Sequence, residues 1–277
     1  MKKIDTHQHY WHYDSHNYPW IDEQMIELKQ NRLPQDSIDY LKQHNITGCI
    51  AVQARQSELE NQFLLNLAEN NHQILGIIGW LDLCQSKATQ PLEKWQDNLV
   101  MKGYRHLIQD EADPDGFFLN TTFNKHVDLI LKQNKVYEVL IHAKNLPSAI
   151  QFFYKHDHSI MVLDHLGKPN IAHGNAQEWK KQIAPLVNQK HVVAKLSGLI
   201  TEAGKNWQSN QIEPYIDIAL EVFGPERLMF GSDWPVCLLA GNYSQVYNLI
   251  ETTINKLSSN EQAAIWGENA KKVYRLD

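Results

Sequence analysis

Histidine and aspartate side chains stand where they could act together on a substrate. His7 and His9 occur in the run Asp5-Thr6-His7-Gln8-His9, and residues two apart on a β-strand point to the same side of it. Two imidazoles on one side can chelate a metal ion. A lone His-x-His motif is weak, because the chain has 14 histidines and such pairs arise by chance.

Three further candidates each follow a short apolar run. His142 comes after Leu140 and Ile141, His165 lies in Asp-His-Leu-Gly, and Asp233 lies in Phe-Gly-Ser-Asp-Trp-Pro. With the first pair they supply imidazole nitrogens and a carboxylate, which suits a catalytic Zn²⁺ that keeps an open position for water. Hydrolysis needs an activated water and a polarised carbonyl, and this set could provide both.

The elements that must position these residues follow a strand and helix rhythm. Amphipathic segments, with apolar residues at roughly helical spacing, separate short apolar runs that are rich in β-formers. We count eight such runs, at residues 2–7, 48–53, 74–80, 99–107, 137–143, 159–165, 191–198 and 227–233. Eight repeats of this unit predict an α/β fold, a (β/α)8 TIM barrel, and the histidines and aspartate at its strand ends make the metal-dependent hydrolase type the expected one. No Gly-x-Gly-x-x-Gly follows the first run, so the usual mark of a dinucleotide fold is missing.

A chain of 277 residues suits one such barrel, which typically needs about 250 residues, and we predict a single domain over residues 1–277. Active sites of these barrels lie at the C-terminal ends of the strands. We therefore expect His7, His9, His142, His165 and Asp233 to converge there. An aromatic insertion at residues 9–27 follows the first strand, and a helical tail at 269–276 ends the sequence.

Composition narrows the class of partner. The net charge of −6 and the absence of a long Lys/Arg run argue against nucleic acid. Without a signal-like apolar region or a membrane-length span, and with three widely spaced cysteines, we expect a cytoplasmic protein. The expected partner is a small-molecule substrate, membrane binding is not expected, and a homo-oligomer is left open.

Longer motifs carry a family resemblance. The HxH after the first strand, the histidine at the sixth and FGSDWP at the eighth resemble the amidohydrolase superfamily. KGYRH at 102–106, DHLGKP at 164–169 and GSDWP at 231–235 are similar to motifs of a narrower branch that contains L-fuconolactonase, L-rhamnonolactonase and 2-pyrone-4,6-dicarboxylate lactonase. The similarity runs along nearly the whole chain. It implies a hydrolase of carboxylic ester bonds that opens a sugar-acid lactone.

The resemblance also implies roles for single residues. Asp233 would take a proton from water, and His7, His9 and His165 would surround the metal or the lactone carbonyl. Arg105 would hold oxygen atoms of the substrate. Lys168 would add a positive point charge.

The metal is left open between two designs. A divalent ion, Zn²⁺ by expectation, would be bound by His7 and His9 with His142 or Asp233 completing the set. His142 departs from the lactonase pattern, in which strand five usually ends without histidine, and resembles metal-binding decarboxylases. A site without a metal is the alternative, because the 2-pyrone-4,6-dicarboxylate lactonase of the same branch resembles a metal-free design.

The aromatic residues of the insertion and of strand eight are candidates to face a sugar ring. We predict Trp11, Trp20 and Trp234 as substrate-binding. Asp5 is expected to support the metal-binding pair, whereas Gln53, Trp80 and Asp82 at the ends of strands two and three are left outside the site.

Two other functions compete with lactone hydrolysis. One is a metal-dependent decarboxylase or hydratase on the same fold, which His142 favours. The other is a catalytically silent binding barrel, which a complete ligand set argues against.

Overall fold

The eight predicted strands form one parallel sheet that is rolled into a barrel, which confirms the (β/α)8 prediction. The computed structural model describes residues 2–276, and its strands pair in chain order. They are β1 (Lys3–Gln8), β2 (Ile46–Val52), β3 (Ile74–Gly79), β4 (Met101–His106), β5 (Val136–Val139), β6 (Met161–Leu163), β7 (Val192–Leu196) and β8 (Leu228–Phe230).

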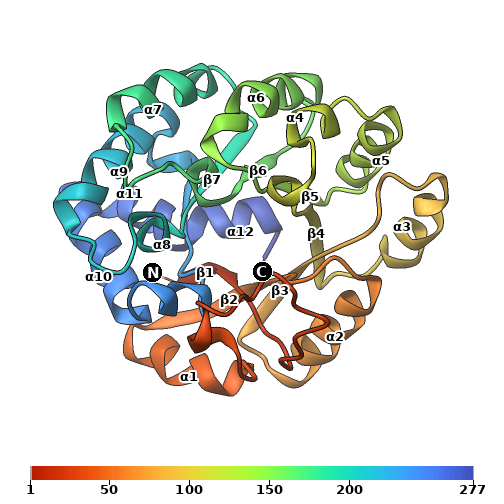
Figure 1. Cartoon of the computed structure of the whole chain (residues 1–277), viewed down its shortest axis with the longest axis horizontal. Coiled ribbons are helices and arrows are strands. Elements are labelled where there is room, and N and C mark those ends of the chain that lie inside the picture. The colour runs from red at the N-terminus through yellow and green to blue at the C-terminus, as the bar shows by residue number, and fades with distance from the viewer. Residues whose placement is uncertain (1, 277) are drawn as a thin grey trace.

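Helices surround the strands on all sides (Figure 1). They are α1 (Pro34–Gln43), α2 (Glu58–Asn70), α3 (Thr89–Trp95), α4 (Pro114–Phe117), α5 (Thr121–Lys132), α6 (Leu146–Lys155), α7 (Ala176–Ile183), α8 (Leu199–Ala203), α9 (Ser209–Phe223), α10 (Tyr243–Ile254), α11 (Ser259–Ala263) and α12 (Asn269–Tyr274). Several begin at a polar cap: the side chains of Ser57, Asn120 and Asn242 accept a backbone N–H in the first turns of α2, α5 and α10. Among the helices described, none has the length and apolar content to cross a bilayer.

The C-terminal helix α12 covers the N-terminal end of the barrel. Its Val273 and Tyr274 pack with Ile4, Val136 and Val193, which point inward from early positions of their strands. In Figure 1 this helix lies across the middle of the ring of strands. The opposite end, at the C-termini of the strands, is left for the site.

The barrel closes between its last and first strands through a short seam. An isolated parallel bridge joins Gln8 to Trp234. The Thr6 hydroxyl donates to the carbonyl oxygen of Phe230 at 2.8 Å, and the Ser232 N–H donates to an Asp5 carboxylate oxygen at 2.8 Å. Side chains of β1 thus hold the last strand in place.

The aromatic insertion folds into a small apolar cluster beside the barrel mouth. Trp11, Tyr18, Ile21 and Leu28 are buried there against Ala54, which follows β2. The insertion therefore has a core of its own and forms one wall of the mouth.

Candidate active site

His7 and His9 both reach the inside of the barrel mouth, as their spacing predicted. Their Nε2 atoms lie 3.2 Å apart. Gly231 of the neighbouring segment makes room for them: a Cβ there would lie 2.8 Å from the Cβ of His7 and 3.0 Å from that of Ser197. Glycine is needed where chains approach this closely.

Asp5 does not share that direction, although it also lies two residues from His7. It accepts hydrogen bonds from Gln8 Nε2 at 2.6 Å and from the Tyr243 hydroxyl at 3.0 Å, on the side of α10. The ladder between β1 and β2 shifts register between Asp5 and Gln8, which breaks the period of two. The Asp5 carboxylate therefore accepts hydrogen bonds from the Ser232 backbone and from the Gln8 and Tyr243 side chains. Burial raises the pKa of Asp5.

Asp233 and His165 complete the central cluster. Oδ1 of Asp233 lies 3.5 Å from His9 Nε2 and 3.8 Å from His7 Nε2. The His7 and His165 rings are 4.4 Å apart between centroids. The two residues have left-handed backbones, with φ of 57° for Asp233 and 51° for His165. Such conformations are uncommon outside glycine and often occur at functional sites.

The electrostatics of the cluster favour an ionised Asp233 carboxylate and neutral His7 and His165 imidazoles. Burial by itself would raise the pKa of Asp233, but His165, His9 and Lys168 together lower it below its ordinary value. Burial lowers the pKa of His165 to about 4. Burial and the Lys195 ammonium lower the pKa of His7 strongly. Asp233 is thus ready to accept a proton.

A buried charged network, which sequence reasoning missed, lies beneath the cluster. Lys195 Nζ of β7 donates to Glu138 Oε2 of β5 at 2.5 Å and lies 3.1 Å from both Asp164 Oδ1 and His7 Nδ1. The Tyr274 hydroxyl of α12 donates to Glu138 Oε1 at 2.7 Å. Burial raises the pKa of Glu138 to about 7 against the effect of Lys195. Glu138 and Lys195 each interrupt an otherwise apolar strand run, and this signal in the sequence could have revealed them.

Arg105 reaches the cluster from β4, but neighbouring groups already use most of its guanidinium. Nη1 donates to Asp164 Oδ2 at 2.9 Å and lies 3.2 Å from His7 Nε2. Nη2 donates to the backbone oxygen of Gln53 at 2.6 Å and to its Oε1 at 3.1 Å. Gln53, left outside the predicted site, therefore positions Arg105, while the Nε of Arg105 lacks a partner among the described residues.

Above the cluster is a cavity of about 350 Å³, the size of a small-ligand pocket. Its lining includes Arg105, His165, Lys168 and Asp233. It is also lined by His9, Trp20, Met25, Ala54, Leu107, Gln109, Asp110, Leu140, Thr201, Glu202, Val236 and Leu239. The lining thus mixes charged, polar and apolar side chains, which suits a ring that carries hydroxyl groups.

Several predicted site residues do not reach this cavity. The His142 side chain is exposed, because β5 ends at Val139 and His142 begins the following 3-10 turn. His142 therefore does not join the cluster. Trp11 is buried in the insertion, and Trp234 is buried against the barrel. Of the three predicted tryptophans, only Trp20 lines the cavity.

The side chains of the central cluster carry imidazole nitrogens and carboxylate oxygens, which are suitable ligands for a divalent ion. Ligand atoms of His7, His9 and Asp233 all lie within 4.8 Å of one another, as do those of His7, Asp164 and His165. Nδ1 of His9 must donate to the Val52 carbonyl oxygen at 2.8 Å, so Nε2 of a neutral His9 turns its lone pair toward Asp233. A cation between them would relieve this contact. The Arg105 guanidinium competes for the lone pair of His7.

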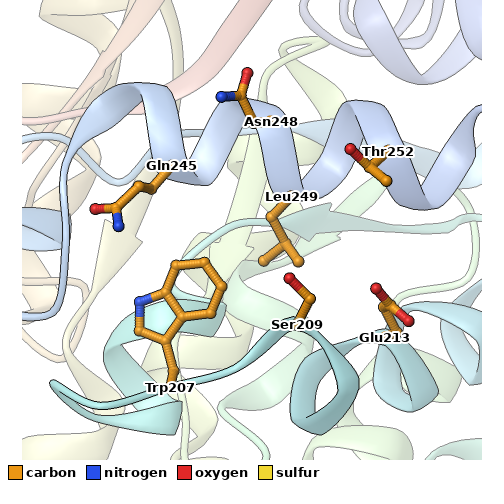
Figure 2. Close-up of a pocket in the computed structure, with 7 residues that line it drawn as sticks. All are labelled: Trp207, Ser209, Glu213, Gln245, Asn248, Leu249 and Thr252. Carbon is orange, nitrogen blue, oxygen red and sulfur yellow. The ribbon is translucent and has the colours of Figure 1, made fainter.

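A second pocket of about 190 Å³ lies between α9 and α10, outside this cluster (Figure 2). Its lining is Trp207, Ser209, Glu213, Gln245, Asn248, Leu249 and Thr252. It offers one carboxylate and no imidazole, so its lining lacks the donor set for metal-assisted or acid–base chemistry.

Known proteins with the same features identify the family. The sequence profile described as "Amidohydrolase" matches residues 4–276. The chain belongs to the amidohydrolase family. It is 38% identical to an L-fucono-1,5-lactonase from Burkholderia multivorans, over 99% of this chain and 96% of that one. It is 29% identical to an L-fucono-1,5-lactonase from Burkholderia ambifaria, with the same coverage of 99% and 96%.

A solved structure agrees with this family. The crystal structure of an amidohydrolase from Burkholderia multivorans, with bound Zn, superposes with a TM-score of 0.96 at 38% identity and covers 100% of both chains. The barrel of this amidohydrolase and the arrangement of its strand ends are therefore those of a solved family member.

Proposed function

We propose that this amidohydrolase opens a sugar-acid lactone, of the L-fuconolactone or L-rhamnonolactone type, with water. The observation that carries the proposal is the buried Asp233 carboxylate beside His9, His7 and His165 at the floor of a small polar cavity. The relatives named L-fucono-1,5-lactonase support the substrate class. The whole chain would act as one catalytic domain in the cytoplasm.

In this proposal Asp233 is the general base. A water beside the carboxylate attacks the lactone carbonyl carbon while its proton passes to Asp233. His165, whose ring lines the cavity, would donate a hydrogen bond to the carbonyl oxygen, where negative charge develops. The bond from the carbonyl carbon to the ring oxygen then breaks, and the proton returns to that oxygen, which gives the open hydroxy acid.

Positioning follows from the charges around the cavity. Lys168, on the left-handed turn after His165, lines the cavity and would attract an oxygen of the substrate. Arg105 would donate its remaining N–H groups to substrate oxygens near His7. Trp20 would cover the apolar face of the ring. A substrate held this way presents its carbonyl to Asp233.

We further propose that the divalent ion is Zn²⁺, bound by His7, His9 and Asp233. When bound, such an ion polarises a carbonyl and makes a neighbouring water more acidic. His142 has no part in this set. The decarboxylase alternative rested on His142, so its exposed position removes the observation that favoured it.

A screen of aldonolactones with a pH indicator tests the function. We expect L-fucono- and L-rhamnonolactones to be opened with a kcat/KM of at least about 10⁴ M⁻¹s⁻¹, and the Asp233→Asn variant to lose this rate. If no lactone is opened faster than by buffer, the proposal is wrong. Release of CO₂ from an aromatic or sugar acid would instead indicate the decarboxylase.

A further inference from the structure

Glu202 is a carboxylate on the wall of the cavity that the proposed chemistry does not use. It lies on the short helix α8, which follows β7, and it lines the cavity together with Lys168 and Asp233. Among residues 2–276 its carboxylate has no hydrogen-bond or ion-pair partner within contact distance. A half-buried carboxylate that faces a cavity in this way has both oxygens available to a ligand.

The backbone around Glu202 is held against the catalytic cluster. Gly198, which begins α8, has a φ of 69°, and a Cβ there would lie 2.7 Å from His165 Nδ1. Ser197 Oγ lies 2.8 Å from the same nitrogen. The Ala172 N–H donates to the Glu202 carbonyl oxygen at 3.1 Å. Contacts at both ends of α8 therefore set the position of Glu202 relative to His165.

The neighbours of Glu202 complete a polar recognition surface. Thr201 also lines the cavity, and its Oγ1 is buried without a hydrogen-bond partner among the described residues. Burial raises the pKa of Glu202, while the charge of Lys168 lowers it and that of Asp233 raises it. Lys168 and Asp233, which line the same cavity, are thus the charged residues that act on this carboxylate.

We propose that Glu202 is a specificity-determining residue that accepts hydrogen bonds from hydroxyl groups of the lactone. The inference rests on the proposed function. An ionised carboxylate only accepts hydrogen bonds, and a polyhydroxy lactone offers neighbouring hydroxyl donors. A site built to bind a substrate hydroxyl rejects an analogue that lacks it, because the buried polar group is left unpaired. Glu202 would read the hydroxyl pattern while Asp233 performs the chemistry.

The test compares the best lactone with a series of analogues that each lack one hydroxyl. The wild-type enzyme should discriminate against one or two members, and Glu202→Ala should abolish that discrimination. The parent lactone should lose about 10- to 100-fold in kcat/KM with Glu202→Ala, as expected for hydrogen bonds to a charged group. For the analogue that lacks the hydroxyl bound by Glu202, kcat/KM should change by less than about threefold with Glu202→Ala. Such a change is too small for the loss of a hydrogen bond to a charged group.

Controls separate the alternatives. Glu213→Gln alters a half-buried glutamate that lines the pocket of Figure 2 and should leave every rate unchanged. Glu202→Gln keeps the side-chain shape, and unfolding temperatures check that each variant folds. An equal loss on every lactone would mean a role in proton transfer and overturn the inference, as would unchanged selectivity. A wild-type enzyme that opens no lactone would overturn the proposed function itself.

Discussion

Nε2 of His9 lies 3.5 Å from Oδ1 of Asp233, and the other nitrogen of the same ring contacts the carbonyl oxygen of Val52 at 2.8 Å. Val52 therefore fixes both the orientation and the tautomer of His9. The carboxylate of Asp233 faces an acceptor nitrogen, and only a proton, a water or a cation between the two groups makes this contact favourable.

Replacing Asp233 should affect turnover rather than binding. Asp233→Asn keeps the shape of the side chain, but an amide cannot accept the proton of the attacking water. We expect kcat to fall by about 10²- to 10⁴-fold with a small change in KM. Steady-state kinetics measure this, with Asp82→Asn outside the cavity as the control. Near-normal turnover would move the base to another residue.

Metal content should depend on His9 and not on His142. We expect elemental analysis to find about one divalent ion per chain, and His9→Ala to lose it with the activity. His142→Ala should keep both, because the His142 side chain is exposed. Full activity in metal-free enzyme would contradict this and would leave hydrogen-bond donors of the site, such as His165, to polarise the carbonyl.

The Lys195 network should contribute to stability as a unit. Lys195→Met leaves Glu138 and Asp164 as buried carboxylates without their shared cation, and we expect the free energy of unfolding to fall by about 3–5 kcal/mol. Adding Glu138→Gln removes one of the two charges and should recover part of the loss.

Urea denaturation measures both changes. The matched control is Lys256→Met, which breaks an exposed pair with Asp217 and should cost no more than about 1 kcal/mol. A Lys195→Met variant as stable as the wild type would mean that the network adds nothing to stability.

Acid should destabilise the protein partly through His165. Burial lowers its pKa from the ordinary 6.5 to about 4, so between these values the unfolded chain binds a proton that the folded chain does not. Stability therefore falls as pH drops from about 6.5 to about 4, by on the order of 3 kcal/mol from this group.

His165→Asn removes the titrating group, and asparagine tolerates the left-handed backbone at this position. Urea denaturation at several pH values between 4 and 7 should show a smaller loss for His165→Asn than for the wild type. Parallel curves for the two proteins would assign the acid sensitivity elsewhere.

Most of the fold followed from local patterns. Each of the eight predicted runs overlaps an observed strand, because strands covered on both sides must be apolar throughout. Helix α3 between β3 and β4 has little amphipathic pattern to predict it, since Thr89–Trp95 buries only Leu92.

Site residues were predicted only where a residue type that can bind a metal or transfer a proton stood at the end of a predicted strand. His7, His9, His165 and Asp233 came together in that way. Glu202 gave no sequence signal, because its position depends on the backbone of Gly198 against His165, a contact between distant segments. Local patterns do not encode such contacts.

At the seam between β8 and β1, catalytic groups from opposite ends of the barrel sequence meet. His7 and His9 flank Gln8, which forms the closing bridge with Trp234, and Asp233 directly precedes Trp234. The Asp233 N–H donates to the carbonyl oxygen of His7 at 2.9 Å. A folding intermediate that holds only half of the strands cannot assemble this pair. Recovered catalysis after denaturation would thus report closure of the whole ring, and half-barrel fragments would become active only by docking to each other.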